Sequence, residues 1–116
     1  MEIKIVKKSI SREELLSIAQ EGFGDVGKAV VDVEQGIMAV GGEFHADEEV
    51  LLMEQEGSKR EHTWGVNLYP KERGDGFVEF DSMVNLKPSF GNRSRIVQDS
   101  QTQKNIRNIV ERLVTR

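Results

Sequence analysis

Residues 28–42 read KAVVDVEQGIMAVGG, and their side chains alternate with the two-residue period of a β-strand. The Gln35-Gly36 pair in the middle is typical of a tight turn. The side chains that share one face on the two sides of this turn are Ala29, Val31, Val33, Ile37, Ala39 and Gly41. The segment therefore predicts a β-hairpin.

A helix is predicted near each end of the chain. Ser11 and Glu14 have capping-box spacing at the start of the first helix, and Gly22 suits its left-handed end. Ser100 and Gln103 have the same spacing before the last helix. The apolar stripes are Leu15, Ile18 and Ala19 in the first helix, and Ile106, Ile109, Val110 and Leu113 in the last.

Four more strands are predicted, at residues 3–5, 50–55, 62–69 and 77–86. The segment 47–55 is ambiguous, because Asp47 could instead cap a short helix. With 50–55 as a strand, the element order is β-α-β-β-β-β-β-α. Short turns between successive strands favour antiparallel pairing. We therefore expect an α+β fold in which two helices pack on an antiparallel β-sheet, formed as one domain over residues 1–116.

Length and composition exclude several classes of protein. The 116 residues contain no cysteine, which removes disulfides, thiolate catalysis and cysteine-ligated metal centres. The net charge of −4 would repel nucleic acid, and no strand interleaves aromatic with basic residues. No apolar run has the length of a signal-peptide core or a membrane span. We expect a soluble, cytoplasmic protein with neither nucleic acid nor a membrane as partner.

The densest polar segment, GGEFHADEE, occupies residues 41–49 directly after the apolar hairpin strand. If the backbone stays extended past Gly42, Glu43, His45 and Asp47 point to one side. Such a set could bind a transition metal, or His45 could act as a catalytic base beside the two carboxylates. The alternative is a solvated loop in which Asp47 caps a turn and His45 is exposed.

A second polar group follows the last predicted strand. Arg93 and Arg95 stand in a loop with Asn92, where guanidinium and amide groups could bind a small anion. The strand residues that could orient this ligand are Asn67, Asp81 and Asn85. Alternatively, the arginines pair with carboxylates such as Asp81 or Glu43 and only tether the loop. No phosphate-loop, dinucleotide or complete catalytic motif is present, so no cofactor is implied.

Four ordered segments, residues 28–49, 64–70, 79–88 and 91–95, are similar to one known family. The chain resembles short bacterial and archaeal proteins that are catalogued as a domain of unknown function, family 5674. The resemblance covers nearly the whole chain, although Phe44, Val84 and Lys87 stand where other side chains are common in the family. Because that family has no assigned activity, cofactor or catalytic residue, the resemblance implies no function.

Three functions remain open from the sequence. A non-enzymatic binding or interaction domain, with a homodimer as one form of it, fits the small size and the lack of a catalytic motif. The alternative is a small enzyme or ligand sensor, in which loops 43–49 and 91–95 meet in a composite metal or anion pocket. A regulatory partner of a larger protein would fit the size and acidity. The pocket hypothesis requires the two loops to face each other.

Overall fold

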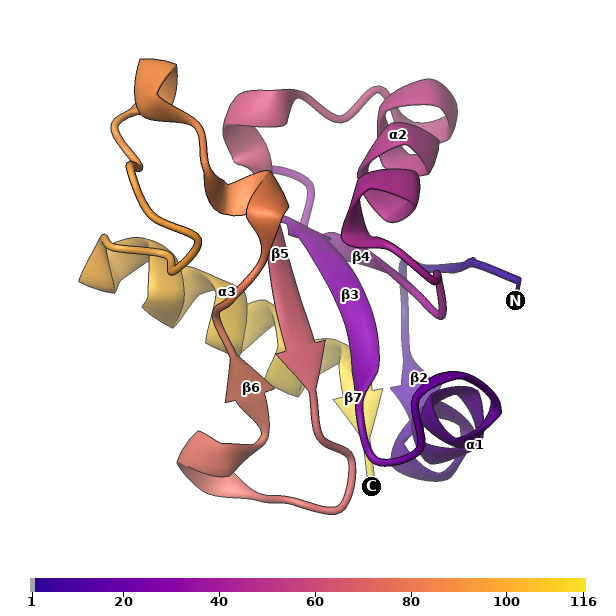
Figure 1. The fold of residues 1–116 in the computed structure, drawn as a ribbon. Helices are drawn as coiled ribbons and strands as arrows, with labels where there is room; N and C mark the ends of the chain where they lie inside the picture. The colour runs from indigo at the N-terminus through magenta and orange to yellow at the C-terminus, as the bar shows by residue number, and fades with distance from the viewer. Residues whose placement is uncertain (1) are drawn as a thin grey trace.

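In a computed structural model of the chain, which describes residues 2–116, five strands form an antiparallel sheet in the order β1-β4-β3-β5-β6 (Figure 1). The strands are β1 (Lys4–Val6), β3 (Gly27–Asp32), β4 (Ile37–Val40), β5 (Thr63–Leu68) and β6 (Val78–Glu79). The predicted hairpin is formed by β3 and β4. The predicted common face is wrong for β4, because Val31 lies opposite Met38 and the side chains of Ile37 and Ala39 point to the other face of the sheet. The α+β class with an antiparallel sheet is confirmed, and the hairpin lies inside the sheet.

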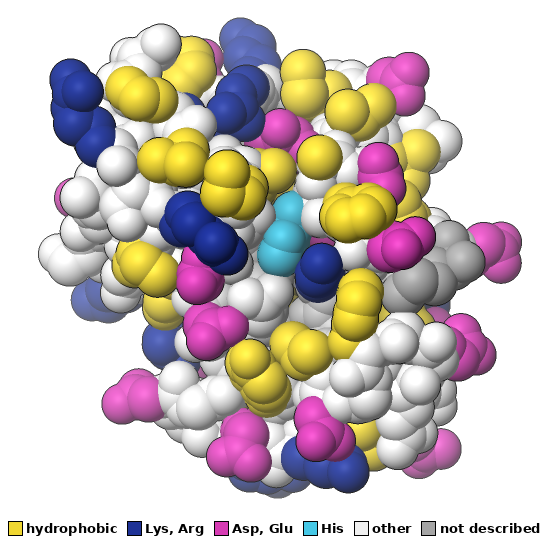
Figure 2. All heavy atoms as spheres, viewed as in Figure 1, with side chains coloured by type: hydrophobic (Ala, Val, Ile, Leu, Met, Phe, Trp, Pro, Cys, Tyr) yellow, Lys and Arg dark blue, Asp and Glu magenta, His cyan; other side chains and the backbone are white. Residues whose placement is uncertain are grey.

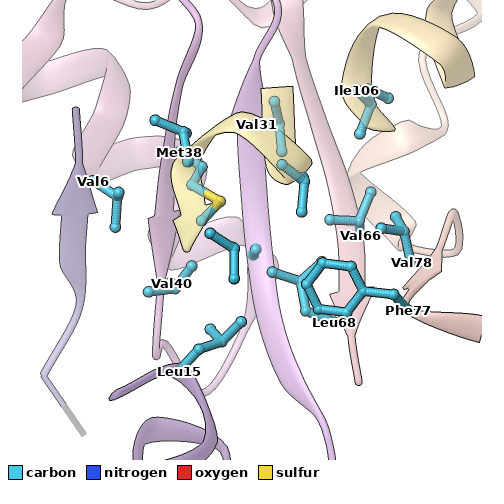
Figure 3. Packing of buried hydrophobic residues seen from close by; sticks show 14 of the residues in the cluster. Val6, Leu15, Val31, Met38, Val40, Val66, Leu68, Phe77, Val78 and Ile106 are labelled. Carbon is cyan, nitrogen blue, oxygen red and sulfur yellow. The ribbon is translucent and has the colours of Figure 1, made fainter. Parts of the chain in front are cut away.

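Helices cover both faces of this sheet. On one face pack α1 (Arg12–Gly22) and α3 (Ser100–Leu113), and Figure 1 shows α3 running behind the strands. Alternate side chains of the strands meet these two helices in the main apolar core (Figure 3). Two short parallel strands, β2 (Ile10–Ser11) and β7 (Val114–Thr115), tie the start of α1 to the end of α3. None of the helices within residues 2–116 has the length and apolar character needed to cross a membrane.

The opposite face is covered by a third helix, α2 (His45–Glu56), which packs against β3 and β4. The strand prediction for residues 50–55 is therefore wrong, and the helical alternative holds, with a start at His45. The apolar stripe of this helix is short, because two of its three buried side chains are glutamates. The three are Glu48, Glu49 and Leu52. Leu52 joins a small second core with Val30, Ile37 and Ala39.

The strand predicted over residues 77–86 is shorter in the structure. After β6 the chain continues through two 3₁₀ helices, η3 (Met83–Asn85) and η4 (Pro88–Phe90). The segment before η3 crosses β5 at Gly65, where a Cβ would lie only 2.5 Å from the Cβ of Ser82. Ser82, Val84 and Asn85 are all buried in this crossing, so the alternation expected of a strand ends where η3 begins.

Candidate functional site

A pocket of about 280 Å³ opens where the start of α2 meets β5 and the segment that precedes η3. Its walls come from parts of the chain that are far apart in sequence. The lining residues are Lys28, Phe44, His45, Ala46, Asn67, Asp81, Ser82, Met83, Val84 and Arg95. Figure 2 shows a histidine at the centre of one face of the molecule, with Lys or Arg side chains on both sides of it and hydrophobic side chains around. The loops 43–49 and 91–95 therefore both contribute to one hollow.

His45 is the first residue of α2, and its ring is held by the sheet. The ring Nε2 lies 2.8 Å from the carbonyl oxygen of Val66, which can only accept, so Nε2 carries the proton and donates it. Burial lowers the pKa of His45 below its ordinary value, and Lys28 adds to this effect against the opposing influence of the Val66 carbonyl, Asn67 and Asp81. The imidazole is therefore a neutral group at neutral pH.

Arg95 reaches the pocket from the loop before α3 and is anchored by one ion pair. Its Nε donates to Oδ1 of Asp81 at 3.0 Å. Within residues 2–116 its two terminal nitrogens make no hydrogen bond, so this part of the guanidinium is available to a ligand. Asn67 links β5 to the segment that carries Asp81. Its Nδ2 donates to Oε1 of Glu79 at 2.8 Å and to the Asp81 carbonyl at 3.1 Å.

Lys28 supplies the second positive charge of the pocket. Its Nζ donates to the backbone carbonyl of Glu43 at 2.9 Å and lies 4.6 Å from the ring centre of Phe23. Two cations, Lys28 and Arg95, thus face one carboxylate, Asp81, among the lining residues. With His45 neutral, the pocket carries one excess positive charge.

The other residues of the first polar cluster lie elsewhere. Glu43 precedes α2 and Asp47 is in its first turn, and both side chains are exposed and outside the pocket lining. The helix at His45 replaces the extended backbone that would have placed the three side chains on one side. Within residues 2–116, no three His, Cys, Asp or Glu side chains form a group able to hold a metal ion.

Two of the predicted ligand-binding residues are buried in the loop framework. Asn85 bonds through its side chain to the backbone N–H and carbonyl of Gly65 and to the carbonyl of Arg95. Asn92 donates to backbone carbonyls, among them that of Asn85 at 2.8 Å. Arg93 is exposed and does not line the pocket. Asn85 and Asn92 therefore shape the loop that carries Arg95.

A buried polar network behind the pocket was not visible in the sequence. Glu49 accepts from Nη1 of Arg60 at 3.0 Å and from the hydroxyl of Thr63 at 2.6 Å. The ammonium of Lys87 donates to the carbonyls of Arg60 and Thr63 and lies 4.4 Å from the centre of the Trp64 ring. Burial lowers the pKa of Lys87 to about 8. The network ties α2 to β5 and to the segment after η3.

The sequence also missed Lys28, Phe44 and Met83 as lining residues. Lys28 is the only basic side chain in the hairpin strand that precedes the turn, which is a weak signal of a special position. Phe44 and Met83 are exposed apolar residues whose role depends on what lies beside them. No local pattern in the chain distinguishes such residues from ordinary surface residues.

Comparison with known proteins identifies a family. A family model described as "Protein of unknown function (DUF5674)" matches residues 4–113 of the 116-residue chain. This match confirms the resemblance noted from the four sequence segments. No curated protein and no solved structure matches the chain significantly. The pocket is therefore interpreted from its own geometry and charge.

Proposed function

We propose that this chain, which belongs to the DUF5674 family of proteins of unknown function, is a non-enzymatic binding domain whose pocket receives one anionic group of a ligand. One observation carries the proposal. Arg95 and Lys28 line the same pocket from distant parts of the chain, and among the lining residues only Asp81 opposes their charge. One further negative charge, supplied by a ligand, would neutralise the pocket.

The geometry of Arg95 favours a preorganised contact with such an anion. Asp81 accepts only from Nε, and this bond orients the guanidinium. Its terminal nitrogens have no hydrogen-bond partner within residues 2–116. Lys28 is likewise held in place by the Glu43 carbonyl. Two cations that are already positioned lose less conformational entropy when a ligand binds.

The start of α2 borders the pocket. Phe44 occupies the N-cap position and has no side-chain hydrogen bond to the amides of the first turn. The partial positive charge of the helix N-terminus is therefore not offset by a capping side chain, although the exposed carboxylate of Asp47 in the first turn opposes it. Phe44, His45 and Ala46 all line the pocket, so an anion there would lie near this end of the helix.

The hydrogen bonds within the pocket favour binding over nucleophilic catalysis. The Nε2 proton of His45 is donated to the Val66 carbonyl, and the hydroxyl of Ser82 accepts from the backbone N–H of Val84 at 3.2 Å. No hydrogen bond joins His45 to Ser82 in the part of the chain that the structure describes. A serine nucleophile needs a base within hydrogen-bond reach, so this pair lacks the arrangement of a nucleophilic site.

The test is an NMR titration of the ¹⁵N-labelled protein with isobutyrate, a carboxylate with a small apolar part. Sodium chloride at the same ionic strength serves as the reference, because screening alone shifts exposed groups. We expect saturable shifts at the amides of Phe44, His45 and Arg95. The absence of saturable shifts in this region would contradict the proposal.

Two neighbouring arginines provide the matched control for this titration. Arg95→Gln removes a lining cation, whereas Arg93→Gln removes an exposed arginine two residues away that does not line the pocket. We expect Arg95→Gln to weaken isobutyrate binding by roughly tenfold or more, the usual worth of one hydrogen bond to a charged group. Equal weakening by both substitutions would show that only the general surface charge matters.

A further inference from the structure

Four exposed apolar side chains line the pocket or lie beside residues that line it. Phe44 and Met83 line it directly. Phe23 lies against the ammonium of Lys28, and Ile96 pairs through its backbone with Asp81. These four side chains have exposed fractions of 44% to 62%. They come from the end of α1, the start of α2, η3 and the loop before α3, and they are named here the apolar rim.

The apolar rim accounts for most of the exposed large hydrophobic side chains in residues 2–116. Seven such side chains are exposed, and the other three are Val50, Met53 and Phe90. Single exposed hydrophobic residues are ordinary, but their concentration around one hollow is typical of a surface that binds a macromolecule. Figure 2 shows hydrophobic side chains gathered around the histidine at the centre of that face.

A small free anion would leave the apolar rim in water. The side chains of Arg95 and Asp81 are themselves partly solvated, with exposed fractions of 57% and 34%. In such a setting water weakens the attraction of a small anion. A larger partner that covers the rim would exclude this water and strengthen the central charge contact, as rings of apolar contacts do around the hot spots of interfaces.

We infer that the pocket and its apolar rim form a docking surface for a protein partner that inserts one Asp or Glu side chain, flanked by apolar residues, toward Arg95 and Lys28. This inference rests on the proposed function, because it identifies a protein side chain as the anionic group that the pocket receives. Charge complementarity supports a carboxylate. The one excess positive charge of the pocket matches a carboxylate more closely than the phosphate of a phosphorylated side chain, which carries about −1.5 to −2 at neutral pH.

The wall that carries Met83 is held by hydrogen bonds on its far side. Arg60 donates to the carbonyls of Val84 and Leu86 at 3.3 and 3.1 Å while it pairs with Glu49. This wall is therefore tied to α2 by partly buried polar bonds. A surface that is already ordered loses little conformational entropy when it docks.

The experiment selects binders from a displayed library of random peptides on the intact wild-type protein. Selected peptides are then synthesised with a fluorophore, and their affinity is measured by fluorescence anisotropy. We expect the selected sequences to share an Asp or Glu between apolar residues, and replacement of that acid by its amide to weaken binding at least tenfold. Selection of no binders, or of binders without a common acid, would overturn the inference.

Matched variants locate the peptide on the surface. Arg95→Gln and Met83→Ser should each weaken peptide binding at least severalfold, whereas Arg93→Gln and Met53→Ser should leave it unchanged. Met53 is an exposed methionine of α2 outside the pocket lining, so it matches Met83 in chemistry. All four positions are exposed, and unchanged thermal unfolding would verify that each variant is folded. Equal effects at the paired positions would overturn the inference.

The outcomes separate this inference from the proposed function. Loss of the acidic-peptide signal with an intact, Arg95-dependent isobutyrate titration would overturn the protein partner and leave the anion pocket. Loss of both would overturn both. Native mass spectrometry at increasing protein concentration tests whether a second copy of this chain occupies the surface. A dimer that Arg95→Gln dissociates would replace the acidic peptide with a second copy and so contradict the inference.

Discussion

The side-chain amide of Asn85 hydrogen-bonds to both backbone groups of Gly65, as a neighbouring strand would. Oδ1 accepts from the Gly65 N–H at 2.8 Å, and Nδ2 donates to the Gly65 carbonyl at 2.9 Å. Within residues 2–116, β6 pairs with β5 only at Asn67 and Leu68, so no strand lies beside Gly65 on the side away from β3. One buried side chain thus completes the sheet there and anchors the wall of the pocket.

Asn85→Ala should lower the free energy of unfolding by about 3 kcal/mol, because the buried N–H and carbonyl of Gly65 both lose their side-chain partner. Urea unfolding followed by the fluorescence of the buried Trp64 would measure the loss. Asn108→Ala, at an exposed position of α3, is the control and should change stability by less than about 0.5 kcal/mol. Similar values for the two variants would contradict the structural role of Asn85.

Gly65→Ala should destabilise the protein by about 1–3 kcal/mol, the usual cost of overpacking a core. A Cβ at Gly65 would lie 2.5 Å from the Cβ and 2.6 Å from the Oγ of Ser82. Gly27→Ala is the matched control, because the nearest atom to its Cβ would be the Ala19 Cβ at 3.9 Å. If the overlap is the cause, Ser82→Gly in the Gly65→Ala background should recover part of the stability. A failure to recover would point to a different cause.

Glu48→Gln should stabilise the protein at neutral pH. The Glu48 carboxyl is fully buried, its Oε2 accepts from the Gly42 N–H at 2.9 Å, and Oε1 has no partner among residues 2–116. Burial raises the pKa of Glu48 well above its ordinary value of 4.5. The folded protein therefore holds this proton more tightly than the unfolded chain does.

The sign of the pH dependence follows from that difference in proton affinity. Above pH 4.5 the unfolded chain loses the Glu48 proton first, so the free energy of unfolding falls as the pH rises toward the raised pKa. Chemical denaturation at several pH values should show this decline in the wild type and a smaller one in Glu48→Gln. Glu54→Gln, at an exposed position of the same helix, should keep the decline of the wild type. Parallel curves for wild type and Glu48→Gln would exclude a buried neutral carboxyl.

Glu49→Gln should lower the free energy of unfolding by about 2 kcal/mol. This loss is smaller than the loss of one partner from a fully buried ion pair, because Arg60 keeps contact with solvent. The side chain of Glu49 has an exposed fraction of 9% and that of Arg60 of 41%. Glu14→Gln breaks the exposed pair with Lys4 and should cost less than about 1 kcal/mol. Urea unfolding of both variants gives the comparison. A larger effect at Glu14 would contradict the ranking.

The starts of the three helices show how well local sequence patterns predict helix boundaries. α1 begins after Ser11, whose hydroxyl accepts from the Glu14 N–H as the capping pattern indicates. α3 begins after Asp99, whose carboxylate accepts from the Thr102 N–H, so the cap lies one residue before the expected Ser100. α2 was ambiguous, because its buried residues include Glu48 and Glu49 and its N-cap residue, Phe44, makes no capping bond.

Local sequence patterns do not predict the positions of the polar side chains in the folded protein. The sequence predicts both Asn85 and Arg95 as ligand-binding residues, yet the side chain of Asn85 completes the sheet at Gly65 and that of Arg95 lines the pocket. Asp81 pairs with Arg95, as the tethered-loop alternative expected, and this same bond holds the guanidinium at the pocket. The sequence shows which chemical groups these side chains carry. It does not show which residues lie beside them in the folded protein.

The central hairpin, the two terminal helices and the α+β class follow from local sequence patterns, because alternation, caps and turns act between residues a few positions apart. The meeting of His45, Asp81 and Arg95 at one pocket depends instead on β5 pairing with β3 and on the segment before η3 crossing over Gly65. Those contacts join residues that are far apart in the chain. They arise when apolar faces are buried together, which places polar side chains side by side without any local signal.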